Sequence, residues 1–194
     1  YALCRPPGHH ATADQYGGFC YLNNAAIAAR YLGTQTKKPV AILDVDYHHG
    51  NGTQSIFYAD PSVLYCSLHA DPALEYPHFW GYAAERGAGA GLGTNHNFPL
   101  PLYVDDAGYL AVLDEALSVI RAFKPGSLVV SLGLDTAEGD LIGDFCLTPA
   151  GFHAIGQRIA ALHLPTVLVQ EGGYNLDTLG QNALAVLTAI KQET

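Results

Sequence analysis

Four short apolar runs, separated by amphipathic stretches, constrain the fold of this chain more than any other feature. None of the runs alternates polar with apolar residues, and they cover 40–43, 63–66, 128–132 and 166–169. Near-continuous apolar runs of this length are typical of strands that are buried on both faces. The stretches around them have helical patterns at 24–32, 106–123, 148–163 and 176–191, whereas the Gly-rich stretch 85–97 is predicted to be a loop. The pattern predicts a three-layer α/β/α fold with a mostly parallel sheet.

Composition narrows the class of protein further. The 194 residues are 49% hydrophobic and 14% charged, which predicts a single globular domain over 1–194 without a membrane span. The formal charge of −9 argues against a nucleic-acid surface and suits a cationic substrate, although ordinary acidic solubility explains it equally well. The four cysteines are widely spaced and form no CxxC pair. They predict a reduced cytoplasmic setting, and neither a zinc ribbon nor a disulfide framework.

Polar clusters follow three of the four apolar runs. Asp44, Asp46 and His48 follow the first run, Asp135 follows the third, and residues 171–174 follow the fourth. In open α/β sheets, ligands bind just beyond the carboxyl ends of the strands. We therefore expect these polar side chains to converge on one edge of the sheet and to form a site.

The run DVDYHHGNG indicates that this site holds a metal ion. If the strand continues through it, Asp44, Asp46 and His48 face the same side, because alternate residues of a strand do. Carboxylates and a neutral imidazole are the ligands of catalytic zinc, which keeps one position open for water. Asp135 is the third candidate ligand, since an unpaired carboxylate beside an apolar strand is costly. Taken alone, Asp135 would be better explained as a helix N-cap.

Two further motifs carry residues suited to proton transfer. His9 and His10 stand in tandem, and the unperturbed histidine pKa of ~6.5 lies near the working pH of a general base. Gly172 and Gly173 would let the backbone approach a ligand closely, and the Tyr174 hydroxyl could donate a hydrogen bond to an oxyanion. In isolation, the first motif could be a turn with two half-exposed imidazoles and the second a Gly-rich turn with a surface tyrosine.

Together and in this order, six motifs resemble the zinc-dependent deacetylases, which include histone deacetylases, acetylpolyamine amidohydrolases and acetoin-utilisation proteins. The motifs are PPGHHA (6–11), GFCYLNNAAIAA (18–29), LDVDYHHGNGTQSIF (43–57), SLH (67–69), SLGLDTAEGD (131–140) and EGGYN (171–175). The resemblance covers nearly the whole chain. It implies an arginase-like α/β sheet with an apolar tunnel that leads to the metal.

The resemblance also implies roles for individual residues. Asp46, His48 and Asp135 match the zinc ligands. His10 matches the general base and acid, which takes a proton from the attacking water and later protonates the departing amine. His9 matches its electrostatic partner.

Further matches concern the tyrosine, the tunnel and a bound monovalent cation. Tyr174 matches the residue that polarises the substrate carbonyl. The tunnel would be lined by Gly18, Phe19, Phe79, Gly172 and Gly173. Asp44 would orient His9 and would also help to bind a structural potassium ion. The other potassium ligands would be the carbonyls of Asp46, His48 and Leu68 and the Ser67 hydroxyl, and a second potassium site would use carbonyls near Phe57, Asp60 and Val63.

Departures from the histone-directed pattern indicate the subclass. Asn51 stands where many histone-directed members have an aspartate beside the second histidine. The run YPHFWGYAAERG (76–87) is most similar to acetylpolyamine amidohydrolases. Glu75 and Glu85 are predicted to lie near the rim of the tunnel, where they would suit a cationic substrate.

The start of the sequence bears on assembly and activity. Members of the family carry a long segment before PPGHHA, which supplies edge strands and a loop over the tunnel mouth, and the sequence given does not include it. An edge strand without its partner invites pairing with another chain, so a homo-oligomer is expected.

Three functions remain open from the sequence. The first is a zinc-dependent deacetylase for acetylpolyamine or acetyl-lysine substrates, with Fe²⁺ or Co²⁺ as possible substitutes for zinc. The second is a shortened, catalytically weak relative that serves as a binding or assembly module. The third is an arginase-like ureohydrolase, which needs two adjacent metals, and Tyr174 with the PPGHH pair argues against it.

Overall fold

A five-stranded parallel sheet forms the centre of the protein, in a computed structural model that describes residues 1–192. The strands follow the spatial order β3-β2-β1-β4-β5 and are all parallel. Their bounds are β1 (Val40–Asp44), β2 (Val63–Ala70), β3 (Asn95–Leu100), β4 (Ser127–Leu132) and β5 (Thr166–Gln170). The predicted α/β class and the mostly parallel sheet are confirmed.

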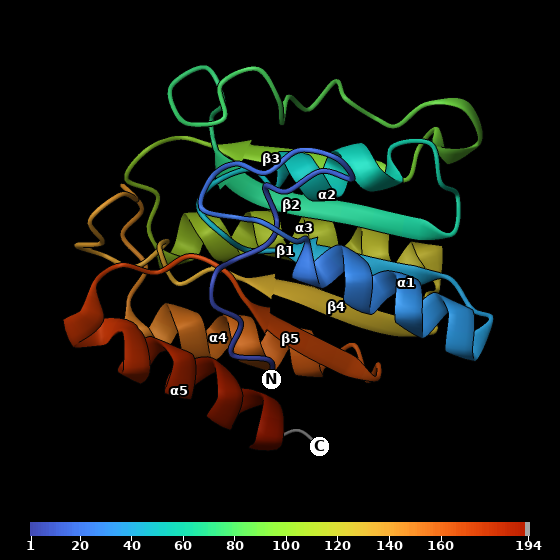
Figure 1. Cartoon of the computed structure of the whole chain (residues 1–194). Coiled ribbons are helices and arrows are strands. Elements are labelled where there is room, and N and C mark those ends of the chain that lie inside the picture. Colours follow the sequence, from blue (N-terminus) through green and yellow to red (C-terminus); the bar gives the residue numbers. More distant parts are fainter. Residues whose placement is uncertain (193–194) are drawn as a thin grey trace.

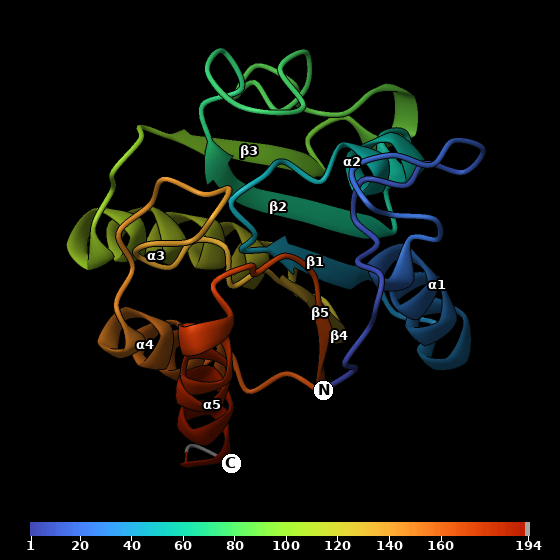
Figure 2. The same ribbon diagram turned by 60° about the vertical axis from the view of Figure 1, so that its left-hand side comes forward.

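Helices cover both faces of the sheet. Their bounds are α1 (Asn24–Thr36), α2 (Asn51–Phe57), α3 (Asp106–Phe123), α4 (Pro149–Ala160) and α5 (Leu176–Gln192). Figures 1 and 2 show α1 and α2 on one side of the strands and α3, α4 and α5 on the other. The carboxyl ends of the strands lie towards the left of Figure 1, where the connecting loops gather.

Two apolar clusters, one on each face of the sheet, explain why the strands have uninterrupted apolar runs. In β1, Val40 and Ile42 pack with α1 in one cluster, while Ala41 and Leu43 pack with α3 and α4 in the other. All four side chains are fully buried. Because alternate strand residues face opposite sides, a sheet covered on both faces needs an apolar residue at every position.

The structure corrects the sequence-based elements in four places. The predicted loop 85–97 is wrong at its end, because Asn95 begins β3. Asn95 and Asn97 are buried polar residues that donate hydrogen bonds to the Gln54 side chain, so the strand lacks an apolar run. Helix α2 (Asn51–Phe57) was not predicted, α4 ends at Ala160 before the predicted 163, and α1 continues past residue 32 to Thr36.

The first residues of the chain extend the sheet beyond β5. Ala2 forms a parallel bridge with Val169, with hydrogen bonds from the Ala2 amide to Leu168 (2.8 Å) and from the Gln170 amide to Ala2 (3.0 Å). This pairing brings the following PPGHH motif to the carboxyl end of the sheet. Residues 193 and 194 of the predicted domain lie outside the described residues.

Candidate metal centre and active site

Three side chains at the carboxyl end of the sheet form a buried cluster with the geometry of a metal site. Ligand atoms of Asp46, His48 and Asp135 all lie within 4.8 Å of one another. His48 Nδ1 is 3.0 Å from Asp135 Oδ2 and 3.4 Å from Asp46 Oδ1. Both carboxylates are fully buried, and His48 is 9% exposed. The structure thus brings together the three side chains that the sequence predicted as metal ligands, which stays a prediction.

The reason these side chains converge differs from the one given by strand alternation. Strand β1 ends at Asp44, so Asp46 and His48 are not strand residues and the alternation argument was wrong. Carboxylates instead hold successive turn amides: Asp44 accepts from the Asp46 amide (3.2 Å) and Asp46 from the His48 amide (2.8 Å). Asp135 accepts from the amide of Tyr47 (3.0 Å) and is therefore not a helix N-cap.

The electrostatics of the cluster favour a bound cation. Burial raises the pKa of Asp135 to about 7, and the nearby charge of Asp46 adds to the shift. Burial lowers the pKa of His48, but hydrogen bonds to Asp135 and Asp46 outweigh it and raise that pKa to about 10. Two buried carboxylates with oxygens within 4.8 Å of each other favour a positive charge between them. Two carboxylates and one imidazole are a donor set that fits zinc.

Gly172 closes the cluster from the β5 side. Its amide donates to Asp46 Oδ2 at 2.8 Å. A Cβ atom at this position would lie 2.5 Å from Asp135 Oδ2 and 2.8 Å from Asp46 Oδ2, which is closer than atoms can pack. Only glycine allows the backbone to approach the carboxylates this closely.

His9 and His10 lie beside the metal cluster with different hydrogen-bond partners. His9 Nδ1 is 3.1 Å from Asp44 Oδ2, and His10 Nδ1 is 2.8 Å from Asn51 Oδ1. Burial lowers the pKa of His9, but Asp46 and Asp44 outweigh burial and raise it well above the usual value. Burial lowers the pKa of His10, and the charge of His9 lowers it further. These opposite shifts favour the protonated form of His9 and the neutral form of His10.

A buried glutamate holds the histidine loop in place. Glu171 Oε2 accepts hydrogen bonds from the amides of Gly8 (2.7 Å) and His9 (3.1 Å), and Oε1 accepts one from the Ser131 hydroxyl (3.1 Å). Burial raises the pKa of Glu171 to about 7. The sequence gave Glu171 no role of its own, and the available signal was its charge directly after an apolar strand.

A pocket of about 260 Å³ opens above the metal cluster. It is lined by Pro7, His9, His10, Gly18, Phe19, Asp46, His48, Tyr76, Ile142, Gly172 and Tyr174. The Phe19 and Tyr174 rings lie with their centroids 6.1 Å apart and their planes tilted by 58°. Gly18 has a positive φ of 53°, and a Cβ there would lie 2.2 Å from the His10 ring. The predicted walls at Gly18, Phe19 and Gly172, and the predicted tyrosine, all border this pocket.

Comparison with known proteins places this geometry in a family. The model of the histone deacetylase domain matches residues 1–190 of the chain. The chain belongs to the histone deacetylase family. Acetylpolyamine amidohydrolase 1 of Pseudomonas aeruginosa is 53% identical over 187 residues, which are 96% of this chain and 54% of that protein. The acetylpolyamine amidohydrolase of Mycoplana ramosa is 48% identical over 190 residues, which are 98% of this chain and 56% of that protein.

A solved structure has the same fold. The crystal structure of acetylpolyamine aminohydrolase from Burkholderia pseudomallei superimposes with a TM-score of 0.93 at 49% identity, covering 96% of this chain and 54% of that one. The chain thus spans about half the length of the relatives it matches. None of the helices within residues 1–192 has the length and apolarity required to cross a membrane.

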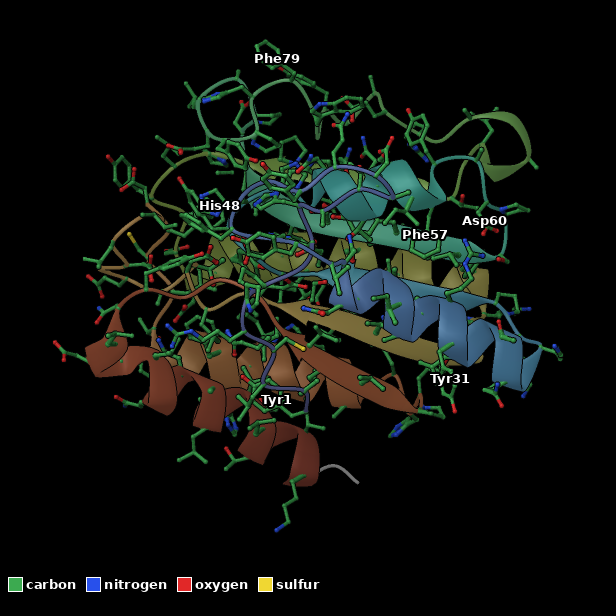
Figure 3. All side chains as sticks on the ribbon, in the orientation of Figure 1. Tyr1, Tyr31, His48, Phe57, Asp60 and Phe79 are labelled. Atoms are coloured by element: carbon green, nitrogen blue, oxygen red, sulfur yellow. The ribbon has the colours of Figure 1, made fainter. Side chains whose placement is uncertain are left out.

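In this deacetylase-family pocket, Tyr76 occupies the place that the sequence gave to Phe79. Tyr76 lines the pocket, with its ring centroid 4.9 Å from that of His10. Phe79 is 84% exposed and lies far from His48 at the top of Figure 3. A tight turn explains the difference. The Phe79 amide donates a hydrogen bond to the Pro77 carbonyl (2.7 Å), and the chain therefore reverses its direction after Tyr76. Gly173, also predicted as a wall, does not line the pocket.

Glu85 corrects a second prediction about the rim. Its carboxylate accepts hydrogen bonds from Gln54 Nε2 (2.6 Å) and from the Gly81 amide (3.0 Å). The side chain is therefore turned inward, where it braces the loop that follows Tyr76 instead of facing the tunnel mouth.

The residues of the first predicted potassium site lie next to one another. Asp44 of β1 is in register with Ser67 of β2, and both are buried, as is Leu68. The Ser67 hydroxyl is also hydrogen-bonded to His69 Nδ1 at 2.8 Å. The residues named for the second site, Phe57 and Asp60, lie at the far end of α2 from His48 (Figure 3).

Proposed function

We propose that this chain hydrolyses the acetamide bond of an acetylated amine, with a zinc ion held by Asp46, His48 and Asp135. The observation that carries the proposal is that this buried cluster borders a pocket which is also lined by His10 and Tyr174. In such a site, a zinc ion would lower the pKa of water and would act as a Lewis acid towards the substrate carbonyl. Every other step can be assigned to side chains of this chain.

His10 is the general base in this proposal. Asn51 Oδ1 lies 2.8 Å from His10 Nδ1 and accepts a hydrogen bond, so the ring hydrogen sits on Nδ1. Nε2 is then left with a free lone pair. A low pKa keeps that lone pair available at neutral pH, and His10 can take the proton of the attacking water. The same atom returns the proton to the departing amine.

His9 and Tyr174 stabilise the charge that develops on the substrate. His9 remains protonated because Asp44 and Asp46 surround it, and its positive charge offsets the negative charge of the tetrahedral centre. The Tyr174 hydroxyl donates a hydrogen bond to the same oxyanion. A preorganised donor of this kind lowers the barrier by about 3 kcal/mol.

The proposed substrates are acetylated polyamines or acetyl-lysine side chains. Phe19 and Tyr76 give the pocket aromatic walls, which suit an alkyl chain between the acetamide and a distant cation. The net charge of −9 favours a cationic ligand. Several relatives are named acetylpolyamine amidohydrolases, which supports the same class of substrate.

The identity of the metal is part of the proposal. Zinc is the first choice, while Fe²⁺ or Co²⁺ would accept the same three ligands. A structural potassium ion is proposed beside Asp44, with Ser67, Leu68 and the carbonyls of Asp46 and His48 as its other ligands. Exchange of the metal followed by activity measurement distinguishes the divalent ions, and a dependence on potassium rather than sodium tests the second site.

Acetate release is the decisive measurement. The purified chain is expected to release acetate from acetylputrescine or from acetyl-lysine peptides when zinc is supplied, and to stop when zinc is chelated. The variant His10→Ala should bind zinc normally and lose turnover. Undiminished turnover in this variant, or no turnover in zinc-loaded wild type on either substrate, would falsify the proposal.

The two other functions are less well supported. A binding module would not need the His10–Asn51 contact or a tyrosine at the pocket, and both are in place. An arginase-like ureohydrolase needs two adjacent metals, whereas one three-ligand group was found within residues 1–192. Tight binding of acetylputrescine without acetate release would favour the binding module.

We also propose that copies of the chain associate and that the protein works in the cytoplasm without a nucleic-acid or membrane partner. Strand β3 is the outer strand on one side of the sheet, and unpaired edges invite pairing between chains. The four cysteines are all free, as expected in a reducing compartment. Light scattering that shows a stable monomer would contradict the association.

A further inference from the structure

The turn that carries Tyr174 needs support from outside itself. It follows two glycines, and Gly173 has a φ of 137°, a conformation that other residues rarely adopt. Glycines leave a turn free to change its path. A tyrosine hydroxyl lies far from its backbone, so a small rotation of the turn moves the hydroxyl by much more.

One carboxylate links this turn to the segment that carries Ile142, another residue of the pocket lining. Asp140 Oδ2 accepts hydrogen bonds from the amides of Tyr174 (2.7 Å) and Asn175 (3.0 Å). Asp140 Oδ1 accepts one from the amide of Ile142 (3.0 Å). Ile142 and Tyr174 both line the pocket. Hydrogen bonds to a charged acceptor at these distances are stronger than neutral ones.

A carboxylate near a helix start could instead serve only the helix. Here the start of α5 has its own cap, because the Asn175 side chain accepts from the Asp177 amide (3.2 Å) and the Asn175 carbonyl accepts from Leu179 (2.9 Å). The two amides that donate to Asp140, those of Tyr174 and Asn175, precede the first helical residue, Leu176. Asp140 therefore acts on the tyrosine turn more directly than on the helix.

We propose that Asp140 is a positioning residue, which holds the Tyr174 hydroxyl at the place where the substrate carbonyl becomes an oxyanion. The inference rests on the proposed function and assigns a role to a residue that touches neither metal nor substrate. A donor must lie within roughly 2.7–3.1 Å of the oxyanion to stabilise it. Misplacement by about 1 Å can lower the rate about 100-fold.

The test compares Asp140 variants with and without the tyrosine hydroxyl. In zinc-loaded protein, Asp140→Ala is expected to lower kcat about 10- to 100-fold at equal zinc content, with KM changed less than about threefold. Asp140→Asn should lose less, because one carbonyl oxygen remains as an acceptor. In a Tyr174→Phe background, Asp140→Ala should change kcat less than about twofold, since the hydroxyl to be positioned is gone. An equal loss in both backgrounds would overturn the inference.

A matched control separates positioning from general loss of stability. Asp105 caps α3 by accepting from the Gly108 amide at 2.9 Å, and it does not line the pocket. Asp105→Ala removes a comparable helix-start acceptor and should leave kcat within about twofold of wild type. If Asp105→Ala lost as much turnover as Asp140→Ala, the effect would be structural and the inference would fail.

Hydrogen exchange provides a readout that does not depend on turnover. Amides 172–179 should exchange faster in Asp140→Ala than in wild type, and should be unchanged in Asp105→Ala. If wild type releases no acetate, the proposed function fails, but the exchange measurement still decides whether Asp140 holds the turn. Unchanged exchange at 172–179 in Asp140→Ala would overturn the inference in either case.

Discussion

The metal cluster and the proton-transfer groups share one pocket but are held in different ways. Asp46 and Asp135 follow β1 and β4 by two and three residues, and these neighbouring strands pair Asp44 with Ser131. The paired strand ends therefore bring Asp46 and Asp135 together, and carboxylate hydrogen bonds to the turn amides complete the cluster with His48. His10 and Tyr174 lie on loops, and carboxylates accept hydrogen bonds from the backbone amides of these loops: Glu171 from Gly8 and His9, and Asp140 from Tyr174.

This difference means that metal binding and turnover can be separated. Substitution of Asp46, His48 or Asp135, which follow the strand ends and are called the strand-end region here, removes the cation and the turnover that depends on it. A change on the loops leaves the cation in place and alters only the groups that move protons or stabilise charge. The effects of the following substitutions are expected to divide along this line.

The largest effect is expected from the strand-end region. Asp135→Ala removes one of three ligands and should abolish stoichiometric zinc binding. Turnover should fall at least about 1,000-fold, because water loses the drop in pKa from ~15.7 to ~7 that zinc supplies. Metal analysis and acetate release measure the two effects. The control is Asp114→Ala, a surface carboxylate paired with Arg158 at 3.0 Å, which should retain both zinc and activity.

A substitution in the loop region should lower turnover without lowering the zinc content. Tyr174→Phe removes only a hydroxyl, so zinc content should match wild type while kcat falls about 100- to 1,000-fold, the usual cost of losing one oxyanion donor. Steady-state kinetics on zinc-loaded protein measures the loss. Zinc loss in this variant would show that the two regions are not independent.

Zinc affinity should depend on pH through the strand-end region. Asp135 and Asp46 raise the pKa of His48 to about 10, so His48 of the metal-free protein carries a proton at neutral pH. Zinc must displace that proton, and its affinity should therefore rise about tenfold per pH unit between pH 7 and 8. Calorimetry in two buffers of different ionisation enthalpy counts the released protons. An affinity independent of pH would contradict a protonated His48.

The smallest effects test which aromatic residue forms the pocket wall. Tyr76 packs against His10, so Tyr76→Ala should lower kcat/KM about 3- to 10-fold, in line with the loss of one aromatic contact. Phe79 is 84% exposed, and Phe79→Ala should change kcat/KM less than about twofold. A greater loss from Phe79→Ala than from Tyr76→Ala would show that the wall has been assigned to the wrong residue.

The sequence predicted that Asp46, His48 and Asp135 would lie together, and they do, although one of the reasons for that prediction was wrong. The order of polar residues after apolar strands placed Asp46, His48 and Asp135 at one edge, and the structure agrees. Strand alternation did not bring them together, because β1 stops at Asp44 and side-chain carboxylates fold the next four residues into turns. Such hydrogen bonds, donated by backbone amides to side-chain carboxylates, have no periodic signature in a sequence.

The sequence alone determined the parallel sheet, the edge at which the site lies and the residue types that can bind a metal. These features follow from local patterns, namely apolar runs buried on both faces and polar residues directly after them. The tertiary structure alone decided that Tyr76 rather than Phe79 lines the pocket, and that Glu171 and Asp140 hold the loops. The position of Tyr76 depends on the direction of a turn, and the roles of Glu171 and Asp140 depend on contacts between residues more than thirty positions apart. Local spacing in the sequence encodes neither a turn direction nor a long-range contact.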